Sequence, residues 1–264
     1  AYQSIKLEQN EIVVAGGQES MSRATHAIFL RDDKKFIEDN LIDTMIKDGL
    51  TDSFNDYHMG VTAENIAEKY HISRREQDTF SISSQKKAKK AYEEKKFNDE
   101  LIKLQIQSNN EKFIFEHDEY LRNNLTLDDL AKLNTVFKEN GTVTPGNSSG
   151  LNDGAAALVL MTREKAELKS LEILASIVSW SSSGVEPSLM GLGPIPSIKE
   201  ALIKAQWQME DIDLFEINEA FAAQTLAVIR ELKIPEEKVN VNGGAIALGH
   251  PIGASGSRIV ATLI

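Results

Sequence analysis

The sequence predicts a layered protein of the α/β class, in which helices and strands alternate along the chain. The clearest evidence lies in residues 173–264, which read as strand, helix, strand, helix, strand, glycine-rich turn and helix. A second observation is that two short apolar runs end at glycine pairs, Gly16-Gly17 and Gly243-Gly244, which indicates two similar halves. With 264 residues, the chain is long enough for one or two domains with a substantial core.

The composition narrows the classes of function. A formal charge of −11 argues against nucleic acid or an anionic membrane as the main partner, and no apolar run approaches the length of a membrane span. The absence of cysteine excludes disulfides, thiolate metal sites and a cysteine nucleophile among these residues, and it favours a cytoplasmic protein. No signal peptide is recognisable, although a chain that starts at Ala1 leaves room for an upstream segment.

The first 60 residues contain one clear strand. Residues 1–9 read as the end of an amphipathic helix, and residues 11–15 read as a short buried strand that Gly16-Gly17 ends. Residues 22–60 show little periodicity, and so long an irregular stretch is typical of a functional or interface loop region.

Two helices are predicted next. Residues 61–70 form the first, and Ser73 and Glu76 form a capping box at the start of a second, longer helix. Residues 101–107 alternate like a strand, and residues 127–137 read as a further helix. The buried side of the long helix is expected to contain Phe80, Ala88, Ala91 and Tyr92.

A turn of small residues at 142–153 leads into an apolar strand at 155–161 and a helix that starts at Thr162. Because binding residues concentrate in loops, this turn is a candidate site, although a simple tight turn explains it equally well. The elements expected beyond it are a strand at 173–180, an extended turn at 190–196, a helix capped by Ser197 and Glu200, a strand at 212–217 and a helix at 221–232.

The stretch 240–258 is the strongest candidate for a catalytic segment. It places His250 between Gly249 and Pro251, where the proline restricts the backbone and holds the imidazole on a stiff, irregular segment before a helix that begins near Ser255. Two other interpretations remain open. One is a nucleotide-binding loop, although the glycines are spaced differently from those of a dinucleotide-binding loop. The other is a structural role, because a single histidine in a turn is more often a hydrogen-bonded structural residue.

Asn218 is a second candidate, because it ends a predicted strand and opens a predicted helix. Binding sites of α/β proteins gather at such strand ends, and an asparagine amide there can hold a water. Asparagine is also a preferred N-cap, which is the simpler explanation when the residue is considered alone.

Considered together, the motifs are far more specific than any one of them. They are residues 11–22, 42–45, 56–60, 146–156, 190–194, 218–222 and 242–256. These motifs resemble those of the thiolase family over the whole length of the chain. His58-Met59 resembles the biosynthetic, acetoacetyl-CoA type of thiolase.

The resemblance implies a five-layered αβαβα architecture of two related halves with an inserted loop domain. Residues 1–22 and 150–171 would belong to the N-terminal half, and residues 172–264 to an incomplete C-terminal half. Residues 23–149 would form the loop domain that binds coenzyme A, and a segment near 24–36 would join dimers into a homotetramer, a dimer of dimers.

The resemblance also implies an acyltransferase that converts two acetyl-CoA molecules to acetoacetyl-CoA and CoA by a reversible Claisen condensation, through an acyl-cysteine intermediate. His250 would activate the nucleophilic cysteine and then donate a hydrogen bond to the thioester oxygen. A water held by Asn218 would complete that oxyanion hole. Coenzyme A thioesters are substrates here, and no cofactor or metal is implied.

Ten residues would bind the substrate by the same resemblance. Ser149 would bond to the pantetheine, and Arg122 would place its charge near the adenosine phosphates. The others would provide the acetyl and pantetheine pocket and apolar contacts: Leu50, His58, Met59, Leu133, Phe137, Met190, Ala220 and Phe221.

The chain departs from the family in lacking both catalytic cysteines. The nucleophile is expected upstream of Ala1 and the second cysteine beyond Ile264, so the sequence is interpreted as truncated at both ends and able to bind CoA at best. Pro145 and Asp129 also replace residues usual in the family, near the adenine end of the ligand. The alternative functions are a catalytically inactive CoA-binding or scaffolding homologue and a condensing synthase acting on carrier-protein thioesters, which His58-Met59 disfavours.

Overall fold

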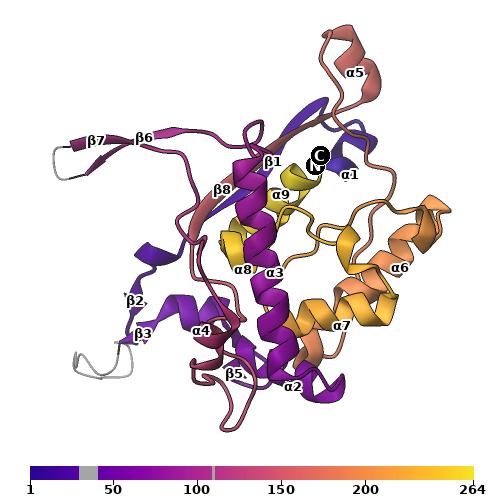
Figure 1. Ribbon diagram of the computed structural model, residues 1–264. Helices are drawn as coiled ribbons and strands as arrows, with labels where there is room; N and C mark the ends of the chain where they lie inside the picture. The colour runs from indigo at the N-terminus through magenta and orange to yellow at the C-terminus, as the bar shows by residue number, and fades with distance from the viewer. Residues whose placement is uncertain (30–40, 109–110) are drawn as a thin grey trace.

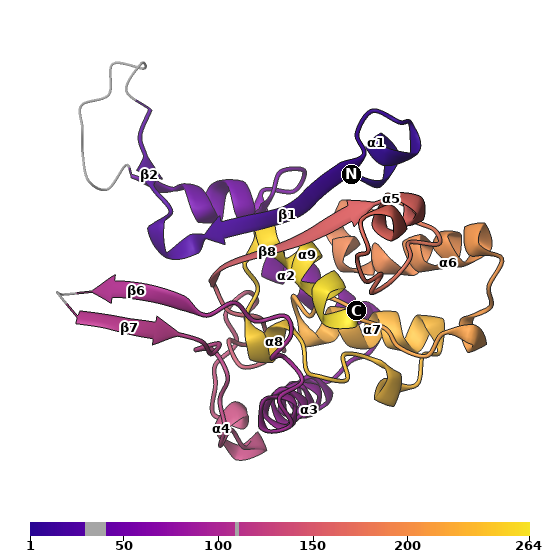
Figure 2. The same cartoon turned by 90° about the horizontal axis from the view of Figure 1, so that it is seen from above.

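The computed structural model describes residues 1–29, 41–108 and 111–264 (Figure 1). Strand β1 (Ile12–Ser20) pairs antiparallel with β8 (Asp153–Met161), in a register that places Ile12 opposite Met161 and Ser20 opposite Asp153. Helix α9 (Ile252–Leu263) packs against both strands (Figure 2). Three segments that are far apart in the sequence therefore form one strand-and-helix layer.

The strand β1 does not end at Gly16-Gly17, as the sequence predicted, but continues through both residues. A Cβ atom on Gly16 would collide with the carbonyl oxygen of Ala156, and one on Gly17 would collide with that of Gly253 in α9. These glycines therefore permit a close backbone approach inside the layer, which is the other common reason for glycine in a strand.

The main hydrophobic core lies where α2 (Met59–Lys69), α3 (Arg74–Glu93) and α7 (Ala222–Leu232) meet the segments around them. The long helix α3 crosses the middle of the molecule (Figure 1). Its predicted capping box is confirmed, because Ser73 and Glu76 each bond to the other's backbone N–H. The buried side chains of this core include Ile66, Phe80, Leu226, Val228, Val239 and Ile246.

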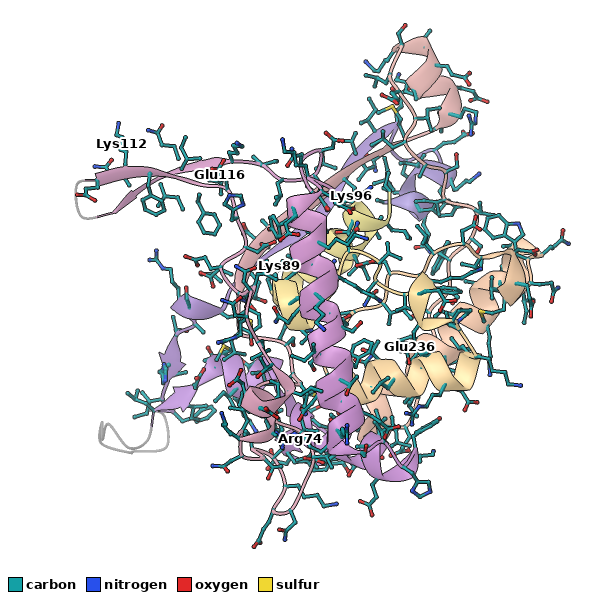
Figure 3. The ribbon with its side chains drawn as sticks, in the orientation of Figure 1. Arg74, Lys89, Lys96, Lys112, Glu116 and Glu236 are labelled. Carbon is teal, nitrogen blue, oxygen red and sulfur yellow. The ribbon has the colours of Figure 1, made fainter. Side chains whose placement is uncertain are left out.

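One further helix, α6 (Pro194–Ala205), is about as long as the core helices α2 and α7, and the remaining elements are short. The hairpin of β6 (Leu104–Ser108) and β7 (Glu111–Phe115) extends away from the body, with Lys112 on it and Glu116 directly after it (Figures 2 and 3). The other short elements are α1 (Tyr2–Lys6), η1 (Met21–Arg23), β2 (His26–Ala27), β3 (Ile42–Asp43), η3 (Met45–Gly49), β4 (Thr51–Asp52), β5 (Tyr57–His58), α4 (Leu127–Ala131), α5 (Arg163–Leu168), η4 (Pro187–Leu192), η5 (Met209–Asp211), η6 (Glu236–Lys238) and α8 (Ala245–Leu248).

Two predicted strands of the second half are absent. Residues 173–180 belong to no helix or strand in the described part of the chain, and most of their apolar side chains are exposed, Leu174 to 73%. The segment 212–217 forms one isolated parallel bridge, from Phe215 to Val239. An apolar run becomes a strand only when a neighbouring backbone completes its hydrogen bonds.

Three predicted helix boundaries also differ. The helix expected at 127–137 ends at Ala131, where Arg74 binds the carbonyl groups of Leu130 and Leu133. Helix α6 begins at Pro194 rather than after Ser197, since the first turn of a helix tolerates proline. Helix α9 begins at Ile252, directly after Pro251.

The segment predicted to join dimers, 24–36, lies partly outside the described residues. None of the helices in residues 1–29, 41–108 and 111–264 has the length and apolar character needed to span a bilayer.

Candidate active site

The backbone of the His250 turn is fixed on the segment that opens β8. The backbone N–H of His250 donates to Asn152 Oδ1 at 3.1 Å. Gly249 has a φ of 99°, a conformation that side chains rarely permit, and a Cβ there would collide with the Asn152 side chain. Pro251 packs on Gly154 in the same way. The stiffness expected of this turn is therefore supplied by contacts to residues about 100 positions earlier.

The imidazole of His250 is held at both nitrogens. Its Nδ1 lies 2.5 Å from Ser255 Oγ, which itself donates to the Pro251 carbonyl at 2.9 Å. Since the serine proton is used in that bond, Oγ accepts from Nδ1–H, and Nε2 keeps its lone pair. That lone pair faces Asn218, whose Nδ2 lies 3.2 Å from Nε2. The network therefore fixes the tautomer in which Nε2 carries no proton and accepts a hydrogen bond from the Asn218 amide.

The charge state of His250 follows from its surroundings. Burial lowers the pKa of the imidazole below its ordinary value, and the positive charge of Arg258 lowers it further. The ring is neutral at pH 7, as a general base must be before it accepts a proton.

Asn218 is not an N-cap. Helix α7 begins at Ala222, and its N-cap is Phe221. The side chain of Asn218 lies against His250 instead, and its Oδ1 is buried without a hydrogen-bond partner among the described residues. Buried carbonyl oxygens are nearly always satisfied, so this atom fits a donor such as a water or a ligand group. Asn218 and His250, 32 residues apart, thus form one polar site.

Glu219 is a buried residue that sequence reasoning did not single out. Its carboxyl group accepts from Ser84 Oγ at 2.7 Å, Asn240 Nδ2 at 2.8 Å and the Ile246 backbone N–H at 3.2 Å. Burial raises its pKa. A Cβ on Gly244 would collide with this carboxyl group, which explains the second glycine of the pair Gly243-Gly244. Glu219 therefore ties the Asn218 segment to the stretch that leads to His250.

Three aromatic rings connect the predicted substrate residues. His58 stacks on Phe137 with a centroid distance of 4.6 Å and an interplanar angle of 19°. Phe137 meets Phe221 edge to face at 6.1 Å. The backbone N–H of Met59 donates to the Leu50 carbonyl at 2.7 Å. The structure thus brings together five residues that are spread over 172 positions of the chain, from Leu50 to Phe221.

Ser149 and Leu133 lie beside this group. Ser149 donates to the carbonyl of Ala220 twice, from its backbone N–H at 3.0 Å and from its hydroxyl at 3.1 Å. Its Oγ can still accept a bond from a ligand amide. The Leu133 side chain lies against Gly146, in the turn that carries Ser149.

Arg122 and Met190 are placed more loosely. Arg122 is exposed, with its guanidinium 5.5 Å from the ring centre of Tyr120, which packs against Gly150. Met190 is 37% exposed, in η4, which packs against α2 and α7. Their contacts with a substrate stay predictions.

Comparison with known proteins identifies the family of this chain. Residues 1–164 match the thiolase N-terminal domain family, and residues 171–264 match the thiolase C-terminal domain family. The chain belongs to the thiolase family. It is 52% identical over 264 residues to an acetyl-CoA acetyltransferase of Paracoccus denitrificans, a match that covers 100% of this chain and 68% of that protein.

Solved thiolases show the same fold. The Bacillus anthracis acetyl-CoA acetyltransferase superposes with a TM-score of 0.95 and 45% identity, over 98% of this chain and 66% of its own. Human mitochondrial 3-ketoacyl-CoA thiolase in complex with CoA gives a TM-score of 0.92 and 42% identity, over 99% of this chain and 65% of its own. The chain thus spans about two thirds of the length of these thiolases, and the predicted family and α/β thiolase-like fold are confirmed.

Proposed function

We propose that this thiolase is an acetyl-CoA C-acetyltransferase, which condenses two acetyl-CoA molecules to acetoacetyl-CoA and free CoA, reversibly. The observation that carries the proposal is the contact of 3.2 Å between Asn218 Nδ2 and His250 Nε2. It joins a neutral base to a half-buried amide, three residues before Phe221, whose ring belongs to the cluster with His58 and Phe137. The high identity to acetyl-CoA acetyltransferases supports the same reaction.

In the first half-reaction, Nε2 of His250 takes the proton of a cysteine thiol. As the thiolate attacks the carbonyl of acetyl-CoA, the C–S bond to CoA breaks, and the departing CoA thiolate takes the proton of a second cysteine thiol. The products are free CoA, a second-cysteine thiolate and an acetylated first cysteine. Neither cysteine is among the 264 residues, which contain none. A sample of these residues alone is therefore expected to show no turnover.

In the second half-reaction, a second acetyl-CoA loses an α-proton to the thiolate of that second cysteine, which also lies outside these residues, and the resulting enolate attacks the acetyl-cysteine. The new C–C bond forms as the thiolate leaves with acetoacetyl-CoA as product. His250, now protonated at Nε2, and a water on Asn218 donate hydrogen bonds to a thioester oxygen whose charge develops during the reaction. Burial of this site strengthens both bonds.

For the substrate, we assign Ser149 to the pantetheine amide and Arg122 to the phosphates. We assign the stacked rings of His58 and Phe137 to one wall of the substrate pocket. The other residues assigned to it are Leu50, Met59, Leu133, Met190, Ala220 and Phe221. CoA thioesters are the substrates, and the reaction needs no cofactor. On the resemblance alone, we also propose a loop domain at 23–149 between the halves 1–22 with 150–171 and 172–264, a homotetramer and a cytoplasmic location.

The test measures thiolysis of acetoacetyl-CoA and affinity for CoA in the full-length protein and in its His250→Ala variant. Turnover that is lost in the variant while CoA still binds supports the assignment. A wild-type protein that binds CoA without turnover would instead be the inactive CoA-binding or scaffolding homologue.

A further inference from the structure

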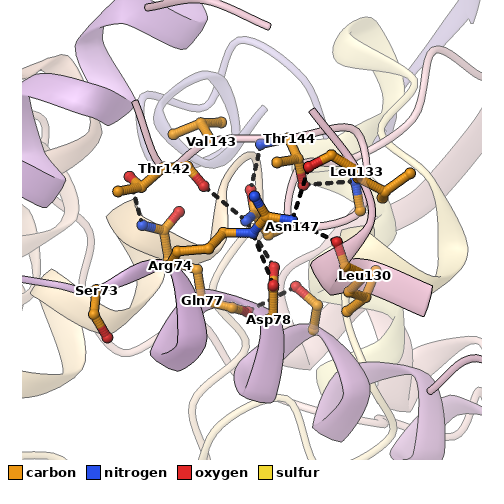
Figure 4. Close-up of polar contacts among 12 residues, drawn as sticks. Ser73, Arg74, Gln77, Asp78, Leu130, Leu133, Thr142, Val143, Thr144 and Asn147 are labelled. Atoms are coloured by element: carbon orange, nitrogen blue, oxygen red, sulfur yellow. Dashed lines mark hydrogen bonds and ion pairs between the residues drawn. The ribbon is translucent and has the colours of Figure 1, made fainter. Parts of the chain in front are cut away.

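An ion pair on α3 contacts two segments that the proposed function assigns to coenzyme A. Arg74 Nε donates to Asp78 Oδ2 at 2.8 Å, one helical turn away (Figure 4). Asp78 is only 4% exposed, and the Arg74 side chain is 25% exposed. Pairs of this type within one helix normally stabilise that helix alone. Here both partners have further bonds that leave the helix.

Asp78 holds the turn that carries Ser149. Its second oxygen, Oδ1, accepts from Asn147 Nδ2 at 3.0 Å. Asn147 is fully buried, and its own Oδ1 accepts from the Thr144 backbone N–H at 2.8 Å. The Asn147 carbonyl accepts from the N–H of Ala222, the first residue of α7, at 2.9 Å. Asp78 therefore fixes the turn against α7, two residues before Ser149.

Arg74 holds the end of α4. Its Nη2 donates to the carbonyl of Leu133 at 3.1 Å and to that of Leu130 (Figure 4). Only a planar guanidinium can bond to a carboxylate through one nitrogen and to two carbonyls through another. Leu130 and Leu133 in turn pack on Gly146, which closes the connection between α4 and the turn.

We propose that Arg74 and Asp78 are positioning residues for coenzyme A. Their pair joins the end of α4, with Leu133, to the turn of Ser149, so that both sides of the CoA site are pre-organised before the ligand arrives. The proposal rests on the proposed function for the identity of the ligand. Neither residue touches the reacting atoms, and so the pair acts on CoA affinity and KM while kcat is preserved.

Two conservative variants separate geometry from charge. Arg74→Lys keeps the positive charge but loses the planar guanidinium that reaches Asp78 and both carbonyl groups at once. Asp78→Asn keeps an acceptor for Asn147 but loses the negative charge. We expect each to raise the Kd for CoA about three- to tenfold, the effect of ordering a few freed side chains on binding, with kcat changed less than about twofold. The matched control is Glu94→Gln, which breaks an exposed pair with Lys90 at the other end of the same helix.

The measurements are calorimetric CoA affinity, KM and kcat for acetoacetyl-CoA thiolysis, and a melting curve, all in the full-length protein. Weakened CoA binding in both variants, with kcat and the control unchanged, supports the proposal. The proposal is overturned if the variants melt at a lower temperature but bind CoA with unchanged affinity. It is also overturned if Arg74→Lys binds CoA as tightly as the wild-type protein does. If Asp78→Asn does not fold, Arg74→Lys decides alone. A wild-type protein that does not bind CoA refutes the proposed function as well, whereas tight binding by every variant refutes only this inference.

Discussion

Replacing Ser255 by alanine tests whether the hydrogen bond to Nδ1 governs the basicity of His250. Ser255 is buried, and its Oγ, 2.5 Å from Nδ1, is the only acceptor for that N–H in the described part of the chain. The variant leaves a buried N–H unpaired in the neutral ring and leaves a charged N–H unpaired once Nε2 has taken the thiol proton. The charged form loses more, because a hydrogen bond to a charged group contributes about 1.5–3 kcal/mol and a neutral one about 0.5–1.5 kcal/mol.

The pKa of His250, already lowered by burial, should therefore fall further in Ser255→Ala. A net loss of about 1–2 kcal/mol for the imidazolium corresponds to roughly one pKa unit or slightly more. A weaker base activates the thiol less well, so we expect kcat/KM to fall about five- to thirtyfold, and the acidic limb of its pH profile to move to lower pH.

The assay is the pH dependence of acetoacetyl-CoA thiolysis in the full-length protein, combined with ¹⁵N spectra of the imidazole rings. The spectrum of His250→Ala identifies the signals of His250, so the proton on Nδ1 can be assigned to this ring. The matched control is Ser257→Ala, a serine of the same helix whose hydroxyl bonds to backbone carbonyls of Ala156 and Ala254. A wild-type pH profile in Ser255→Ala, or a wild-type ring that carries its proton on Nε2, would refute the reasoning.

Three further outcomes are expected. His250→Ala should reduce kcat of the full-length protein far more than Asn218→Ala, for which the loss of one oxyanion contact predicts about 10²–10³; equal losses in steady-state kinetics would contradict the division of roles. Arg122→Ala should weaken CoA binding less at high salt than at low salt, whereas Ser149→Ala should reduce the binding free energy by about 0.5–1.5 kcal/mol at both. If calorimetry finds the same salt response for both variants, the ligand is placed wrongly. Burial raises the pKa of Glu216 to about 7, so folding favours its protonated form, and the free energy of unfolding should decrease as the pH rises from about 4.5 to about 7. Glu216→Gln should flatten this pH dependence in urea titrations, and an unchanged dependence would exclude Glu216 as its source.

Much of the site could be predicted because its chemistry is concentrated in short motifs. Residues 218–222 and 242–256 placed Asn218 and His250 in the sequence, and the structure shows that they meet. The capping box at Ser73 was also predictable, since a cap depends only on residues within one helical turn.

The contacts that complete the site were beyond sequence reasoning. Phe137 stacks on His58 because Gly60 leaves room for its ring, and that contact links positions 79 residues apart. The strand predicted at 173–180 failed for a related reason, because apolar composition says nothing about whether a second backbone lies beside the run. Gly16-Gly17 was misinterpreted as a strand end because glycine permits both a turn and a close approach, and only the position of α9 distinguishes the two.

The close approach of Gly17 to Gly253 has a consequence for how this protein tolerates substitutions. The helix that contains Ser255 rests on β1 through main-chain atoms, so the distance from the strand to the His250 turn does not depend on the size of any side chain at that crossing. Side chains on the outward face of the strand, such as Val14, can therefore vary without moving the imidazole. Gly17→Ala would push helix α9 away from β1. The imidazole of His250 would move with the helix, although residue 17 does not touch it.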